Sequence, residues 1–238
     1  METITIEDDG ETFKNEYWLP ALSLKKKSLE IMSNPKWMSD EEIDPFLDII
    51  EKQGKNINQV FKPMSVFDQA FEKHFGDERT KMNPSTKFIA LINNSYDTEQ
   101  GESSFHSLGN HWITLSNVFT TNTEQYNVVA LYDSLNLEKL TPDTIKYLRF
   151  MMHHETKRIK VVRMPVTHQQ GSWSCGYHAV ANSVSVALGY RPEKNDYESS
   201  ELLQKHAKEI LENQVLELFP VKEGEEGFTN IQHKEFFL

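Results

Sequence analysis

The chain has 238 residues, of which 38% are hydrophobic and 11% aromatic, so it can bury a real core and is not disordered throughout. Its 36 acidic residues outnumber 25 basic ones, which gives a formal net charge of −11. This charge argues against nucleic acid or an anionic membrane as a partner and favours a partner with a basic surface. The sequence has no apolar run of about 20 residues and begins with the acidic METITIEDDG, so we expect neither a membrane span nor a signal peptide. We expect a monomer in the cytoplasm or nucleus, or one delivered into a host cell.

The predicted elements follow one another as separate runs of helices and strands. Ser39 and Glu42 form a capping box that opens a helix, and Gly54 can close it. Helical spacing also predicts helices over Ser65–Gly76, from Thr141 to Met152, over Cys175–Leu188 and over Ser200–Gln214, whereas apolar runs and alternation predict strands over Phe88–Ile92, His111–Val118, Val128–Asp133 and Ile159–Val162. This pattern is typical of the α+β class.

No internal repeat and no flexible linker divides the chain, so we expect one folded domain over residues 31–219. Residues 1–30 form an acidic, weakly patterned N-terminal extension. Residues 220–238 form a C-terminal tail in which glycine and glutamate are mixed with phenylalanine. This tail is either mobile or docked by its aromatic side chains.

Cys175 is the only cysteine, so it can form neither an intrachain disulfide nor a thiolate cage for a metal ion. It is therefore either a small buried hydrophobic residue or a nucleophile. The predicted helix begins at Cys175, and the positive end of the helix dipole favours the reactive thiolate. Gly176 has no side chain, which leaves room for a substrate backbone. A structural cysteine would more naturally lie in mid-helix beside Val180 and Val184, so the position favours chemistry.

A nucleophilic cysteine needs a base, and among the nine histidines His111 is the best candidate because it opens a strand. A hairpin with its tip near Asn122 pairs His111 with Asp133 and Ile113 with Leu131, and it keeps the apolar pair on one face. Asp133 would then accept a histidine N–H and determine the tautomer. The alternative is an ordinary half-buried polar pair.

Acyl transfer also needs hydrogen-bond donors for the negative charge that develops on the carbonyl oxygen. Gln169 lies six residues before Cys175 and can donate a side-chain N–H, while the backbone N–H of Cys175 can donate a second bond. Gln170 competes for the first role, and spacing alone barely separates the two glutamines. Either could instead be a solvated loop residue.

Four motifs in this order resemble the ubiquitin-like-protease family of cysteine peptidases, the SUMO-protease and deneddylase group related to adenain. They are Trp37-Met38-Ser39-Asp40, His111-Trp112, Asp133, and the segment from Gln169 to Cys175-Gly176, and they span roughly residues 35–190. The resemblance implies a papain-like or adenain-like fold, in which a helix carrying the cysteine packs against a small mixed sheet. It also implies four roles: nucleophile for Cys175, general base for His111, its orienter for Asp133 and oxyanion donor for Gln169.

The same resemblance implies a substrate. Family members thread the diglycine tail of a modifier between two tryptophans, which match Trp37 and Trp112, and flat aromatic walls admit glycine while they exclude larger residues. Each tryptophan could instead fill the core. Asp40 matches a position that contacts the modifier, or it is a helix N-terminal carboxylate stabilised by the dipole. Trp173 and Ser174 depart from the residues usual in the family, which bears on the choice of modifier more than on the chemistry.

We therefore predict a thiol peptidase or isopeptidase that cleaves after the terminal diglycine of ubiquitin or a ubiquitin-like modifier (SUMO or Nedd-type), through a thioester and without a metal or organic cofactor. One alternative is an effector-type acetyltransferase on the same fold, although such enzymes usually carry glutamate where Asp133 stands. The others are a catalytically silent protein that only binds the modifier and a non-enzymatic scaffold with an acidic surface. The scaffold leaves the clustering of the catalytic residue types unexplained.

Overall fold

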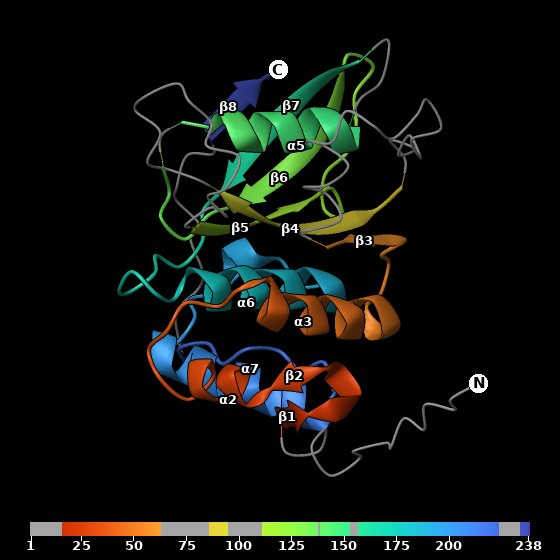
Figure 1. Ribbon diagram of the computed structural model, residues 1–238. Coiled ribbons are helices and arrows are strands. Elements are labelled where there is room, and N and C mark those ends of the chain that lie inside the picture. Colours follow the sequence, from red (N-terminus) through yellow and green to blue (C-terminus); the bar gives the residue numbers. More distant parts are fainter. Residues whose placement is uncertain (1–15, 63–85, 95–110, 138, 153–156, 224–233) are drawn as a thin grey trace, which may run out of the picture.

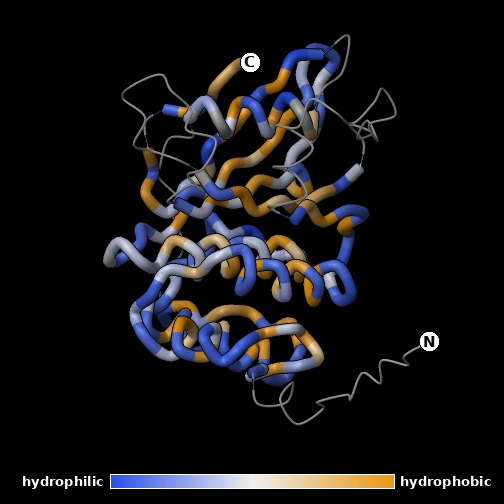
Figure 2. The backbone as a smooth tube through the Cα atoms, viewed as in Figure 1, coloured by the Kyte–Doolittle hydropathy of each residue, from blue (hydrophilic) through white to orange (hydrophobic). Residues whose placement is uncertain are grey.

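The computed structural model describes residues 16–62, 86–94, 111–137, 139–152, 157–223 and 234–238, and these form stacked layers (Figure 1). A sheet lies in the middle, one helix covers one of its faces, and further helices cover the other. Hydrophobic residues are concentrated in the strands and in the helices that pack against them (Figure 2). The helix predicted over Ser65–Gly76 lies outside the described residues.

The central sheet is mixed, as predicted. Its strands, in spatial order, are β3 (Gln59–Phe61), β4 (Phe88–Asn94), β5 (His111–Ser116), β6 (Tyr126–Tyr132), β7 (Arg158–Met164) and β8 (Lys234–Phe237). The pairs β3–β4 and β6–β7 are parallel, and the other three pairs are antiparallel. Because strand side chains alternate between the faces, Ile113 and Leu131 pack into one core and Trp112 and Tyr132 into the other.

The helices divide between the two faces of the sheet. Helix α5 (Pro142–Met152) covers one face, while α6 (Cys175–Leu188) and α3 (Asp40–Gln53) cover the other, with α7 (Ser200–Asn213) and α2 (Lys26–Ile31) beyond them (Figure 1). Helix α6 contacts β4, β5, α3 and α7, and all its residues from Cys175 to Ala187 are buried. The cysteine helix is thus the centre of the larger core. The predicted α+β class is confirmed.

The predicted capping box at the start of α3 is present, and its carboxylate also joins two helices. Glu42 accepts hydrogen bonds from the Ser39 backbone N–H at 2.8 Å and from the Ser39 hydroxyl at 2.7 Å. It is fully buried and also accepts a bond from the hydroxyl of Ser28 in α2 at 2.6 Å. These bonds satisfy a buried carboxylate and hold α2 against the start of α3.

The predicted register of the β5–β6 hairpin is wrong by two residues. Leu115 lies opposite Leu131, and Ser116 lies opposite Ala130. The pairing between β5 and β6 starts farther from the loop than predicted, because side chains of the loop already bond the backbone of Val128. Asn122 accepts the Val128 N–H at 2.9 Å, and Thr120 donates to the Val128 carbonyl at 2.6 Å. A shift of two residues keeps every side chain on its predicted face.

Parts of both predicted end segments are built into the fold. Within residues 1–30, β1 (Tyr17–Leu19) pairs with β2 (Leu24–Lys25), and Leu24 is buried in the larger core. Within residues 220–238, β8 adds an antiparallel edge strand to β7 and packs Phe236 against the core beneath α5. The described helices are all too short or too polar to cross a membrane.

Candidate active site

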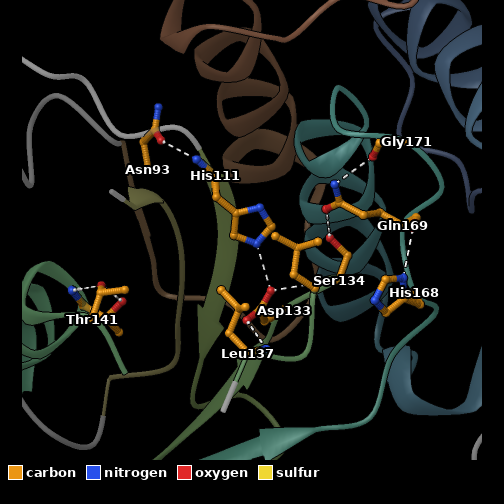
Figure 3. A network of polar contacts seen from close by, with 11 residues as sticks. Asn93, His111, Asp133, Ser134, Leu137, Thr141, His168, Gln169 and Gly171 are labelled. Carbon is orange, nitrogen blue, oxygen red and sulfur yellow. Dashed lines mark hydrogen bonds and ion pairs between the residues drawn. The ribbon is translucent and has the colours of Figure 1, made fainter. Parts of the chain in front are cut away.

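Three elements end or begin at one place, and each brings one of the predicted side chains. His111 is the first residue of β5, Asp133 directly follows β6, and Cys175 is the first residue of α6. Figure 3 shows the imidazole of His111 pointing at the carboxylate of Asp133, with Gln169 nearby. The structure therefore brings together residues that lie more than sixty positions apart in the sequence.

His111 and Asp133 form a buried hydrogen-bonded pair. Nε2 of His111 lies 2.8 Å from Oδ1 of Asp133, and the two side chains are each 2% exposed. The carboxylate also accepts the backbone N–H groups of Leu135 at 2.9 Å and Leu137 at 3.2 Å. Because a carboxylate only accepts, Nε2 must carry a hydrogen, which leaves Nδ1 to exchange a proton with a thiol.

The surroundings of His111 favour its charged form. Burial lowers the pKa of its imidazole, but the hydrogen bonds and negative charge of Asp133 and Cys175 outweigh burial and raise this pKa to about 9. Burial also raises the pKa of Asp133, yet His111 and the two backbone N–H groups hold it below its ordinary value. An imidazolium at His111 is thus stabilised at neutral pH, as a base that removes a thiol proton requires.

We expect this pair to make stability depend on pH. The pKa of His111 is about 9 in the folded protein against 6.5 ordinarily, so its stabilisation is fully present below pH 6.5 and is lost as the pH rises through 9. The free energy of unfolding should fall by up to about 3 kcal/mol over that interval. Urea unfolding at both ends of the interval measures the change. His111→Gln should lose this dependence, and an equal fall in both proteins would contradict the assignment.

Cys175 is 2% exposed and lies at the start of α6, within hydrogen-bonding reach of His111. The space beside Gly176 is not open to a substrate, contrary to the prediction from the sequence. A Cβ atom there would lie 3.1 Å from both Cβ and Sδ of Met38, and 3.3 Å from Cδ1 of Trp112. The glycine therefore lets α3 and β5 pack closely against the start of the cysteine helix.

Gly176→Ala tests this packing. The added methyl group should push Met38 away and lower the free energy of unfolding by about 1–3 kcal/mol. Thermal unfolding measures the net change, in which the higher helix propensity of alanine offsets up to about 1 kcal/mol of the loss. A Gly176→Ala protein as stable as the wild type would show that the contact is loose.

The two glutamines that the sequence leaves in competition are placed differently. Gln169 is 7% exposed; its Nε2 donates to the carbonyl of Gly171 at 2.9 Å, and its Oε1 accepts from the hydroxyl of Ser134 at 2.8 Å. Gln170 is exposed, and its backbone carbonyl accepts a bond from the hydroxyl of Ser174 at 2.9 Å. The side-chain amide of Gln169 is therefore the one held next to the His–Asp pair (Figure 3).

The residues predicted to bind substrate lie around the same end of α6. Trp112 is 4% exposed, and its indole N–H donates to the carbonyl of Met38 at 2.8 Å. Trp37 is the neighbour of Met38 and is 49% exposed. Asp40 is partly exposed in the first turn of α3. One tryptophan is thus fixed in the core and the other faces solvent on the adjoining segment.

In the part of the fold that the structure describes, His178, one turn along α6, is buried without the polar partners that His111 has. It is 2% exposed, and neither ring nitrogen has a hydrogen-bond partner among the described residues. Burial, followed by the charges of His168 and His111, lowers its pKa to about 4, so it stays neutral. No group of histidine, cysteine and carboxylate side chains in the described part of the chain is arranged to hold a metal ion.

Two supporting residues escaped the sequence analysis. Asn93 of β4 accepts the backbone N–H of His111 at 3.2 Å, and Ser134 contacts Gln169. Ser134 directly follows Asp133, and this position beside a candidate catalytic acid could have marked it as part of the site. Asn93 offered none, since its pairing partner is known only once β4 and β5 are aligned.

The comparisons find similarity in structure only. No protein-family model and no curated protein matches the sequence. Among solved structures, the Ulp1 protease domain in complex with Smt3, the yeast ortholog of SUMO, is 13% identical with a TM-score of 0.55; the alignment covers 90% of this chain and 97% of that one. The SUMO protease Ulp1 with its catalytic cysteine oxidized to a sulfinic acid is 14% identical with a TM-score of 0.54, over 90% and 98% of the chains. The chain therefore has the fold of these cysteine proteases.

Proposed function

We propose that the protein is a cysteine peptidase or isopeptidase that cleaves after the C-terminal diglycine of ubiquitin or a ubiquitin-like modifier. One observation carries this proposal: a lone cysteine at the start of a buried helix lies within reach of a histidine that a buried carboxylate holds at 2.8 Å. A nucleophile, its base and the orienter of that base are the parts that acyl transfer through sulfur requires.

The chemistry follows from these positions. The thiol proton of Cys175 passes to Nδ1 of His111, and the thiolate sulfur attacks the glycyl carbonyl carbon. The negative charge on the carbonyl oxygen is stabilised by an N–H of Gln169 and by the backbone N–H of Cys175. His111 gives its proton to the leaving amine as the C–N bond breaks, which leaves a thioester. Water then attacks the thioester, His111 takes a proton from that water, and the C–S bond breaks to release the carboxylate and the free thiol.

The modifier is the substrate class that the surroundings support best. By the family resemblance, Trp37 and Trp112 match the two tryptophans that flank a diglycine tail, and Asp40 at the start of α3 suits contact with a basic surface. The solved complex of the same fold holds Smt3. Most of the binding energy should come from the folded body of the modifier, away from the scissile bond.

Cleavage of a panel of modifiers tests the proposal. Ubiquitin, SUMO and Nedd-type proteins, each with a fluorogenic amide after the diglycine, are incubated with the full chain, and mass spectrometry identifies the new C-terminus. We expect at least one modifier to be cut after the second glycine. A folded protein that cuts none of them would contradict the proposal, and consumption of acetyl-CoA by that protein would point instead to an acetyltransferase.

Gln169→Ala tests the oxyanion donor, and the exposed neighbour Gln170→Ala is its matched control. Loss of a donor aimed at the developing charge should lower kcat by about 10²–10³-fold, with little change in KM. Gln170→Ala should leave both constants near those of the wild type. Steady-state cleavage of the modifier identified above measures both variants. A larger loss at Gln170 than at Gln169 would reverse the assignment.

A further inference from the structure

We infer that Ser134 is a positioning residue, which holds the side-chain amide of Gln169 so that one N–H of its Nε2 is available to the oxyanion. The inference rests on the proposed function, in which Gln169 donates to that oxygen. Ser134 directly follows Asp133, is 2% exposed, and donates its hydroxyl hydrogen to Oε1 of Gln169 at 2.8 Å. It does not contact the reacting atoms and acts only through Gln169.

A side-chain amide has two orientations, and only one of them assists the reaction. The N–H side stabilises an oxyanion, whereas the carbonyl side repels it. The carbonyl of Gly171 can only accept, so the NH₂ group of Gln169, at 2.9 Å, must face it. The hydroxyl of Ser134 then faces Oε1 as a donor. Both bonds select the same orientation, and they leave the second hydrogen of Nε2 for the substrate oxygen.

The main chain of Ser134 reinforces this arrangement. Its carbonyl accepts the backbone N–H of Gln169 at 3.0 Å, so both ends of Gln169 are tied to the same residue. Ser134 lies in the turn in which the backbone N–H of Asn136 donates to the Asp133 carbonyl at 3.0 Å. One turn after β6 therefore carries both the carboxylate that orients His111 and the hydroxyl that orients the oxyanion donor.

The partner on the other side of the amide depends on a glycine. Gly171 has a φ of +81°, in the left-handed region that residues with a side chain rarely adopt. A Cβ atom there would also lie 3.1 Å from Nε1 of Trp173. The loop conformation that presents the Gly171 carbonyl to Gln169 thus requires glycine.

Two reactions of the same thiol separate positioning from simple support of the fold. Acylation of Cys175 by p-nitrophenyl acetate passes through an oxyanion, whereas alkylation by iodoacetamide does not. Ser134→Ala should slow acylation roughly threefold to tenfold, because the amide loses one of the two bonds that set its orientation. Alkylation should proceed at the wild-type rate. Ser134→Thr keeps the hydroxyl and should restore acylation.

Ser116→Ala is the matched control. Ser116 is also a buried serine, whose hydroxyl donates to the carbonyl of Phe88 at 2.7 Å at the other end of β5. Ser116→Ala should change neither reaction, whatever its effect on stability.

The inference is overturned if Ser134→Ala slows both reactions equally, slows neither, or matches Ser116→Ala. A wild type that cuts no modifier but is acylated by the ester would sink the proposed function alone, and the Ser134 comparison would still be decisive. A wild type that the ester does not acylate would overturn the oxyanion site itself.

Discussion

Replacing Cys175 with alanine is expected to abolish cleavage while the protein keeps its fold and its affinity for the modifier. Removal of the nucleophile from a complete site typically costs about 10⁴-fold or more in kcat, since no other group can form the acyl intermediate. Cys175 is the only cysteine, so no second thiol can replace it. The side chain lost is small and buried at a helix start, so the fold should tolerate alanine.

Two measurements on this variant distinguish an enzyme from a binding protein. The cleavage rate of the preferred modifier should fall to background, and calorimetric titration should give a Kd for that modifier close to the wild-type value. Full cleavage by Cys175→Ala would show that a group other than Cys175 cuts the bond. If the wild type and the variant bind the modifier equally and neither cleaves it, the protein is a catalytically silent modifier-binding protein.

Asp133→Asn is expected to have the second largest effect, a fall in kcat of about 10³–10⁴-fold with a smaller effect on binding. The carboxylate accepts from Nε2 of His111 and from the Leu135 N–H through Oδ1, and from the Leu137 N–H through Oδ2. An amide can accept on one side only. If its oxygen faces His111, its NH₂ group opposes Leu137. If it flips, its NH₂ group faces Nε2 and drives the proton to Nδ1, which can then no longer accept from the thiol.

The same substitution should change the pH profile, because the negative charge of Asp133 helps to raise the pKa of His111 to about 9. In the variant that pKa should be lower, so less imidazolium is present at neutral pH to protonate the leaving amine. Kinetics across pH 6.5 to 9 measure this shift. Asp48→Asn, at a surface carboxylate paired with Lys62, is the control and should leave kcat unchanged. Equal effects of the two substitutions would contradict the role given to Asp133.

The residues of the candidate site could be predicted because the sequence shows their types and the elements in which they lie. A lone cysteine at a helix start, a histidine that opens a strand and an acid that closes the next strand are each visible within a few residues. The predicted hairpin register was wrong, yet His111 and Asp133 still meet. The register differs from the prediction by two residues, so His111 and Asp133 remain on the same face of the sheet. The Asp133 carboxylate therefore reaches the His111 ring from a diagonal position instead of the directly opposite one.

What could not be predicted depends on contacts between distant segments. The link between Ser134 and Gln169 joins residues 35 positions apart, and no local pattern marks it. The strand β8 has only four residues, too few for a periodicity argument, and its pairing with β7 identifies it as a strand. The role of Gly176 was misjudged because the sequence does not show that Met38 and Trp112 fill the space beside it.

Covalent capture tests the central claim most directly. Ubiquitin, SUMO and Nedd-type proteins, each ending in a thiol-reactive electrophile in place of the last glycine, are mixed with the full chain, and the adduct is digested and mapped by mass spectrometry. The proposed site predicts one adduct, a thioether on Cys175, with at least one modifier and none in Cys175→Ala. A folded protein that gives no adduct with any modifier, or an adduct that persists in Cys175→Ala, would contradict the assignment of Cys175 as the nucleophile of a modifier-specific peptidase.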